Sequence, residues 1–282
     1  MPVYRSGVAD ELDIRGPGPR LRGHAHRYYG YAVTRTGPAR EREPLTAGVV
    51  LIFGLGPELR LVEPDGGSVR LGSFVAGLGD RCAVVEHEGE MRGLPVDLSP
   101  LAARRIFGVP MHELARRVVT LEDAIGREAP LLEERLFEAV HWSDRFELVE
   151  AALATRLEAV EAPPPDVDWA WRRLESARGR IRVAQLAKEI GCSRKHLAAR
   201  FRDHVGLPPK LVARVLRFRE AGDRMLASPH STITEVAAEC GYYDHAHLDR
   251  DFRDFAGTTP TAYAADLRTP VTFVQDGAAV PS

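Results

Sequence analysis

The chain has 282 residues, enough for about two domains, and its charged (28%) and hydrophobic (44%) fractions are those of a folded globular protein. No apolar run is long enough to cross a membrane and no signal peptide follows Met1, which argues against a membrane or secreted protein. The formal net charge of −2 gives no sign of a nucleic-acid partner for the chain as a whole.

Residues 1 to about 98 have the pattern of β structure, with short runs rich in Val, Tyr and Leu between turns such as Pro64-Asp65-Gly66-Gly67. The expected strands are Tyr28–Thr34, Gly48–Phe53, Glu58–Val62, Ser68–Val75, Cys82–Glu88 and Met91–Val96. Together they predict a small sheet or barrel.

Two histidines precede the first of these strands, in Gly23-His24-Ala25-His26. Residues two apart in a strand share a face, so the pair could ligate one metal ion with help from the strand near His87. The rest of a metal-binding pattern is absent. Exposed histidines beside a loop are therefore the preferred interpretation, and no metal or other cofactor is expected. Three nearby tyrosines could line an apolar ligand pocket or be ordinary strand residues: Tyr28, Tyr29 and Tyr31.

Helical patterns follow the strand region, beginning where Ser99 provides an N-cap and Pro100 occupies the first helical position. Pro110 and Thr120 mark further helix starts. The expected helices are Leu101–Phe107, Met111–Val118, a short turn from Thr120 to Ile125, Leu131–Val140 and Arg145–Val160.

The last of these helices has an apolar stripe at spacings of three and four: Phe146, Val149, Leu153, Leu157 and Val160. This stripe either docks on its own domain or pairs with a second copy in a homodimer. Three consecutive prolines in Glu161–Asp166 then favour a stiff extended linker. We expect a β-rich sensing and dimerisation domain with C-terminal helices at about 99–160 (residues 1–162), a linker (163–168), a second domain (169–268) and a flexible tail (269–282).

The second domain contains one helical unit written twice, in Val183–Pro209 and Ile233–Pro260. Both copies end in Phe-Arg-Asp-x-x-Gly-x-x-Pro. Each copy is punctuated as a helix-turn-helix, because Gly191 and Gly241 can end a first helix and Ser193 and Asp244 can cap a second. The second, recognition helices are expected at about Arg194–His204 and His245–Phe255, joined by a long helix at about Pro209–Ala227.

Positive charge is concentrated in the first copy. Trp169–Arg268 holds 18 Lys and Arg against 12 Asp and Glu, a net +6, which leaves −8 elsewhere. Trp169–Arg219 has 14 against 3 (+11), whereas Glu220–Arg268 has 4 against 9 (−5). Since attraction to phosphates supplies much of the affinity for DNA, the first unit is expected to dominate binding.

The paired units and their ending resemble the DNA-binding domain of the AraC/XylS transcriptional regulators. The residues that carry this resemblance are Asp244, Arg250, Phe252, Gly257, Pro260 and Tyr263. The resemblance covers about the last third of the chain, and it implies a cupin-like sensing barrel in the N-terminal part. The expected fold class is thus α+β: a β-rich, cupin-like domain with a helical extension, followed by an all-α domain.

Candidate DNA contacts follow from position in the two units. The first turn of a recognition helix usually reaches base edges, whereas flanking cations bind phosphates. The candidates for base edges are Arg194, Lys195 and His196, and Arg180 and Arg182 are candidates for phosphates. Arg200 is suited to a phosphate or to a neighbouring carboxylate. A departure from the family is that alanines, Ala198 and Ala199, stand where polar base readers are common.

The second recognition helix offers His245, His247 and Arg250, but aspartates surround them. Two hypotheses follow. The second unit either touches DNA weakly, with Arg250 on a phosphate or held by an aspartate, or presents an acidic surface to RNA polymerase.

We therefore expect a DNA-binding transcriptional regulator in the cytoplasm, with promoter duplex DNA as its partner. A small-molecule effector and a second copy of the chain are further expected partners. The alternative is a cupin-like enzyme with a DNA-binding tail, which needs a reactive cysteine or a full metal set. Three free cysteines without metal-ligand spacing (Cys82, Cys192 and Cys240) provide neither, so an enzyme is not expected. A purely structural interaction protein conflicts with the basic first unit.

Overall fold

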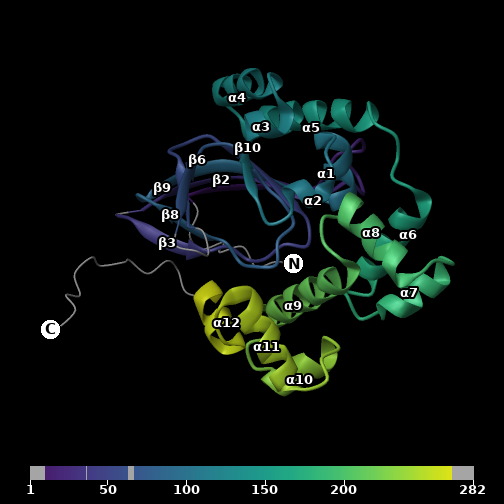
Figure 1. Ribbon diagram of the computed structural model, residues 1–282. Coiled ribbons are helices and arrows are strands. Elements are labelled where there is room, and N and C mark those ends of the chain that lie inside the picture. The colour runs from purple at the N-terminus through teal and green to yellow at the C-terminus, as the bar shows by residue number, and fades with distance from the viewer. Residues whose placement is uncertain (1–9, 36, 63–66, 269–282) are drawn as a thin grey trace.

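The computed structural model describes residues 10–35, 37–62 and 67–268. Antiparallel strands of the N-terminal part form two sheets, and the helices of the C-terminal part lie beside and below them (Figure 1). The expected α+β class is confirmed. None of the described helices is both long and apolar enough to span a membrane.

The larger sheet has the strand order β1-β2-β9-β4-β7-β10: β1 Glu11–Arg15, β2 Ala25–Thr34, β9 Glu90–Leu98, β4 Val49–Gly54, β7 Phe74–Ala76 and β10 Val118–Thr120. The smaller sheet has the order β3-β8-β5-β6: β3 Ala39–Arg42, β8 Val84–His87, β5 Leu59–Val62 and β6 Ser68–Leu71. Ile52 and Phe74 of the larger sheet pack against Leu61 and Val85 of the smaller one. The two sheets thus enclose a small apolar core, as in a cupin-like barrel.

Most of the expected strands are present, with shifts of a few residues. The single strand expected over Ser68–Val75 is wrong, because the chain bends at Gly72-Ser73 and passes from one sheet to the other. Strands β1, β3 and β10 were not expected. The turn at residues 64–66 lies outside the described residues. Of the three tyrosines, Tyr28 faces the helices, where its hydroxyl donates to Glu150 at 2.5 Å.

Helices α1 (Pro100–Phe107), α3 (Leu121–Ile125), α4 (Glu128–Glu138) and α5 (Trp142–Glu158) form in the expected order, with α4 and α5 each beginning three residues and ending two residues before the expected positions. Helices α3–α5 lie over the larger sheet (Figure 1). Side-chain oxygens of Ser99 and Thr120 accept the capping amide protons of α1 and α3. The helix expected over Met111–Val118 is too long. Helix α2 spans only Met111–Leu114, because Arg116 has a φ of 61° and the chain then enters β10.

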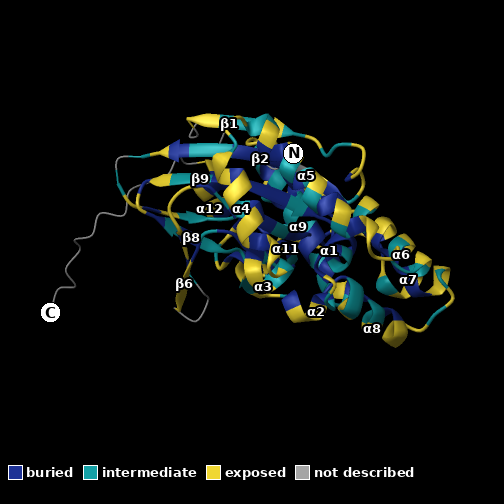
Figure 2. Ribbon diagram, turned by 90° about the horizontal axis from the view of Figure 1, so that it is seen from above, coloured by how far each residue is buried: buried dark blue, intermediate teal, exposed yellow. Residues whose placement is uncertain are grey.

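The apolar stripe of α5 packs on its own domain. Phe146, Val149, Leu153 and Leu157 are buried against the larger sheet and α1, whereas Val160 is partly exposed. In the burial-coloured view from above, the helices have dark inner and yellow outer faces (Figure 2). The first of the two alternatives for this stripe is therefore confirmed.

The proline-rich linker is shorter than expected. Residues 161–164 have no regular secondary structure, and Pro165 is the first residue of α6 (Pro165–Ser176). Proline fits the first helical position because its fixed φ suits a helix and its missing N–H has no partner there anyway. The second half of the expected linker, 165–168, is thus helical.

The C-terminal helices are α7 Val183–Glu189, α8 Arg194–His204, α9 Pro209–Ala227, α10 Ile233–Glu239, α11 His245–Ala256 and α12 Pro260–Arg268. The repeated Leu and Phe of α8 and α11 are buried, as their spacing predicts. Phe218 of α9 packs against Phe252 and Tyr263, with ring centroids 4.6 and 5.3 Å away. The tail expected at 269–282 lies outside the described residues.

Candidate nucleic-acid interface

The turns of both units have the geometry that the sequence predicts. Gly191 and Gly241 adopt φ values of 70° and 76°, in the left-handed region that favours glycine. The Ser193 hydroxyl accepts from the His196 amide at 3.1 Å, and the Asp244 carboxylate accepts from the His247 amide at 2.7 Å. These caps fix the residues at which α8 and α11 begin.

The first turn of α8 carries uncommitted positive charge. Arg194, Lys195 and His196 are all exposed. Within the described residues, several cations of the first unit form no side-chain hydrogen bond or ion pair: Arg182, Lys188, Arg194, Lys195, Arg202 and Lys210. Such side chains can bind phosphates or base edges without breaking a contact of the fold.

Arg200 has an intramolecular partner. Its guanidinium lies 2.8 Å from Asp166 of α6, so the neighbouring-carboxylate alternative describes its position. The equivalent residue of the second unit is Asp251, which accepts from Arg214 of α9 at 2.9 and 2.7 Å. Each recognition helix is thus joined to the helix before its unit by an ion pair, with the charges exchanged between the two copies. The sequence repeat conceals this pairing because the two residues differ in sign.

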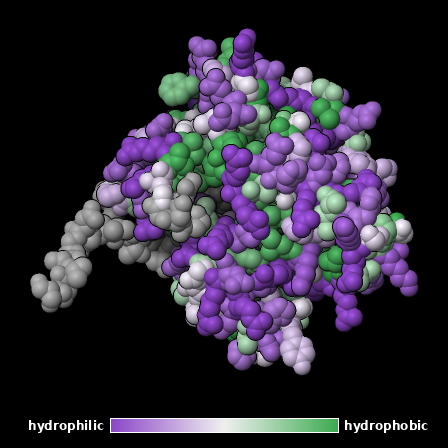
Figure 3. Space-filling model, viewed as in Figure 1, coloured by the Kyte–Doolittle hydropathy of each residue, from purple (hydrophilic) through white to green (hydrophobic). Residues whose placement is uncertain are grey.

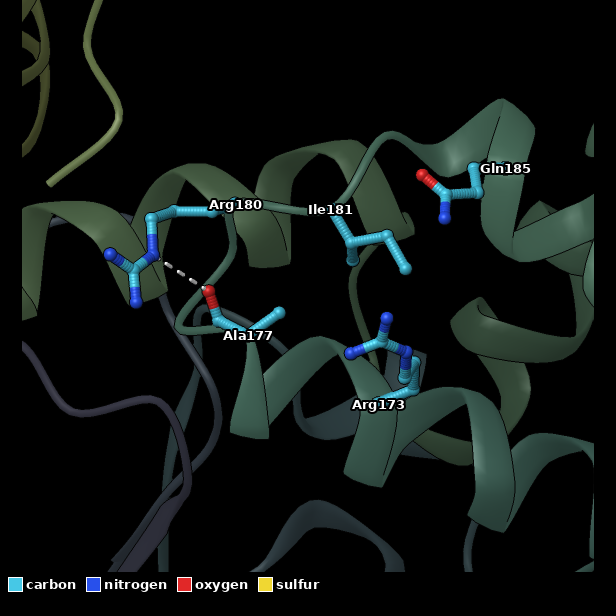
Figure 4. A pocket seen from close by; sticks show the side chains of 5 residues that line it. All are labelled: Arg173, Ala177, Arg180, Ile181 and Gln185. Atoms are coloured by element: carbon cyan, nitrogen blue, oxygen red, sulfur yellow. Dashed lines mark hydrogen bonds between the residues drawn. The ribbon is translucent and has the colours of Figure 1, made fainter.

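Arg180 also serves the fold. Its Nε donates to the Ala177 carbonyl at 3.3 Å and its Nη1 donates to the Glu239 carbonyl at 3.1 Å, which links the two units. Arg180 lines an open hollow of about 300 Å³ with Arg173, Ala177, Ile181 and Gln185, and its side chain turns away from Gln185 toward the Ala177 carbonyl (Figure 4). The Arg180 side chain also lies against Gly241, where a Cβ would be only 2.9 Å from the Arg180 Cγ.

The acidic residues of the second unit do not form a bare acidic face. Every Asp and Glu from 220 to 268 has a capping or ion-pair partner: Glu220, Asp223, Glu235, Glu239, Asp244, Asp249, Asp251, Asp254 and Asp266. Asp249 pairs with Arg253 at 3.9 Å rather than with Arg250. Arg250 itself is exposed and has no such partner among the described residues. The net charge of −5 therefore overstates the acidity available to a partner.

The first turn of α11 presents a different set of side chains from that of α8. His245 is exposed, but the His247 ring packs on the buried Tyr242 ring, with centroids 5.1 Å apart. Tyr243 is 93% exposed and immediately precedes the N-cap Asp244. Sequence reasoning missed Tyr243, although an aromatic residue next to a predicted N-cap was a usable signal.

The N-terminal domain contacts both recognition helices at their C-terminal ends. Just after α8, Gly206 lies so close to α2 that a Cβ at this position would be only 2.9 Å from the Met111 carbonyl oxygen. At α11, the Cys82 amide donates to the Phe255 carbonyl at 2.7 Å. Hydrophobic side chains show in the middle of the face in Figure 3, between the two parts. The packing leaves the first turns of both helices uncovered.

The two histidines of the N-terminal domain lie apart from this interface. Burial lowers the pKa of His24. His26 Nε2 lies 3.4 Å from Glu175 of α6, so it joins the two domains. No group of three or more His, Cys, Asp or Glu side chains suited to a metal ion occurs in the described part of the chain.

The C-terminal part of the chain thus contains two helix-turn-helix units joined by one long helix. Residues 186–266 match the family described as helix-turn-helix domain. A similar curated protein is the HTH-type transcriptional regulator Rv1931c of Mycobacterium tuberculosis, 32% identical over 87 residues. That match spans 31% of this chain and only 33% of the regulator.

Two solved structures are also similar. ToxT from Vibrio cholerae has a TM-score of 0.50 at 10% identity, over 86% of this chain and 98% of ToxT, so the likeness concerns the fold. An AraC-type transcriptional regulator from Chromobacterium violaceum is 22% identical over 38% of this chain and 95% of its own, with a TM-score of 0.34.

Proposed function

We propose that this protein is a transcriptional regulator that binds promoter DNA through both helix-turn-helix units, with the first unit supplying most of the affinity. One observation carries the proposal: the first turns of α8 and α11 are exposed while the opposite ends of both helices are packed on the N-terminal domain. A recognition helix reads the major groove with its N-terminal residues, so the uncovered ends are the functional ones.

Roles follow from which side chains are uncommitted. Arg194 and Lys195 read base edges, where a guanidinium can bond guanine at two points. Arg182 contacts phosphate. In the second unit, Arg250 and Tyr243 contact DNA. The other candidates have different roles: Arg180, Arg200 and His247 hold the units in position, and His196 and His245 supplement the contacts of their turns.

We further propose that an effector controls DNA binding through the N-terminal domain. The direct contacts of that domain with α8 and α11 support this, because a ligand that changes the packing changes the relative energy of two arrangements. RNA polymerase and a second copy of the chain are the further partners in this proposal. The partnered carboxylates make an acidic polymerase-binding face less favoured than DNA contact. A dimer would need a surface other than the buried stripe of α5.

The test is selection of random DNA duplexes by the full chain, followed by titration of the enriched site. Arg194→Ala is expected to weaken binding by about 1–3 kcal/mol and to relax the sequence at one position. Arg182→Ala is expected to weaken binding to all DNA sequences alike and to reduce the slope of log K against log salt concentration by about 1, the loss of one phosphate contact. The control is Arg70→Ala, an exposed arginine of β6. If no sequence is enriched and salt abolishes binding to every duplex, the proposal of a sequence-specific regulator is refuted.

A further inference from the structure

A cavity of about 190 Å³ lies between the larger sheet and helices α3–α5. Its floor is apolar: Leu51 and Phe53 of β4, Leu132 of α4, and Ala152 and Leu153 of α5. Alternate residues of a strand face opposite sides of a sheet. Leu51 and Phe53 face the helices, whereas Ile52 between them packs into the core between the sheets. The cavity is therefore outside the barrel.

The rim of the cavity is charged. Arg156 of α5 is fully engaged: it binds the Glu128 carboxylate at 2.8 Å and the carbonyls of Ile106 and Ile125 at 3.3 and 2.6 Å. Arg135 also lines the cavity, is exposed, and has no side-chain partner in the described part of the chain. Because Glu128 is already neutralised by Arg156, Arg135 leaves the rim with one uncompensated positive charge.

We propose that this cavity binds a small amphipathic monocarboxylate, with its apolar body on the floor and its carboxylate on Arg135. A cavity of about 150 Å³ lined by Leu, Ile and Phe is large enough to hold benzene. The volume here thus suits a single ring or a short alkyl chain. Leu131 at the mouth is 61% exposed, and the bound ligand covers it. The inference rests on the proposed function, in which an effector acts through this domain.

The cavity is connected to the DNA-binding domain by two elements. Its wall α5 continues through residues 159–164 into α6, which holds α8 through the Asp166–Arg200 ion pair. Its rim residue Arg156 binds the last turn of α1, and Arg104 of α1 lies 3.8 Å from Asp203 of α8. A ligand that moves α5 against α1 therefore changes the support of the first recognition helix.

The test is calorimetric titration of the full chain, without DNA, by hexanoate and 3-phenylpropanoate and by their uncharged amides. Both acids are expected to bind, and each amide to bind at least about tenfold more weakly, because the amide oxygen still accepts from the guanidinium but the attraction between two opposite charges is lost. Arg135→Gln is expected to weaken the acids by a similar factor. Arg127→Gln, an exposed arginine before α4 that does not line the cavity, is expected to change nothing.

Ala152→Phe fills the cavity and is expected to abolish binding of acids and amides while circular dichroism shows an unchanged fold. Absence of binding by both acids at millimolar concentration overturns the proposal. So does equal weakening by Arg135→Gln and Arg127→Gln, or unchanged binding in Ala152→Phe. Affinity for the enriched duplex is measured separately. A chain that binds DNA but neither acid refutes this inference alone, whereas one that binds the acids but no DNA refutes the proposed function.

Discussion

Replacement of Arg214 by methionine is expected to destabilise the protein far more than the same replacement of Arg200, although the two arginines have equivalent roles in the two units. Arg214→Met removes the cation from Asp251, whose side chain is 1% exposed. A buried charge left without a partner costs about 3–5 kcal/mol. Arg200→Met leaves Asp166, whose side chain is 36% exposed and stays hydrated, so the cost is about 0.2–1 kcal/mol.

The assay is urea unfolding of the full chain followed by circular dichroism, with the slope of the transition compared between variants. Double-mutant cycles with Asp251→Asn and Asp166→Asn isolate the two pair energies. Asp251→Asn alone is expected to cost less than Arg214→Met, because the amide oxygen still accepts from the guanidinium and no buried charge remains. Equal costs for Arg214→Met and Arg200→Met, within about 0.5 kcal/mol, would refute the reasoning from burial.

Three further results are expected. Gly241→Ala should lower the free energy of unfolding in urea by about 1 kcal/mol more than Gly191→Ala. Both substitutions place a Cβ on a left-handed backbone, which is strained, but only the one at 241 also brings that Cβ within 2.9 Å of the Arg180 side chain. Burial raises the pKa of the Cys82 thiol to about 11, so only about one part in a thousand of it is thiolate at pH 8. Iodoacetamide at pH 8 should therefore alkylate Cys192 before Cys82, which mass spectrometry of the labelled chain would show. The hydrogen bond from Arg116 lowers the pKa of Asp80, so the ionised Asp80 stabilises the fold above the unfolded-state pKa of about 3.8, and this stabilisation is lost as the pH falls through the lower folded-state pKa. Asp80→Asn should therefore reduce the loss of stability between pH 5 and pH 2, measured by urea unfolding.

Local signals predicted the C-terminal domain well. Gly191, Ser193 and Asp244 act through backbone conformation and caps within a few residues, so the sequence around each position determines its role. The bounds of α8 and α9 agree with the expected ranges to the residue, and α11 differs by one. The burial of the repeated Leu and Phe followed in the same way from helical spacing.

Features that depend on distant parts of the chain were not predictable. The partners of Arg200 and Asp251 lie 34 and 37 residues earlier, so the sequence left open whether Arg200 meets a phosphate or a carboxylate and could not name the partner of either residue. Strand β10 has only three residues and is defined by its pairing with β7, which no local pattern reveals. The cavity beneath α4 likewise brings together β4 and α5, which are about a hundred residues apart in the sequence.

The packing of the N-terminal domain against the ends of both α8 and α11 has a consequence for the architecture of promoters. One inserted base pair moves two half-sites apart by about 3.4 Å and rotates one against the other by about 34°. A single connecting helix could accommodate part of that change by bending. Here the Arg180 link and the N-terminal domain bridge the same two units. With the proposed function, the full chain should therefore hold its two units at one spacing, and its binding sites should vary in sequence more readily than in spacing.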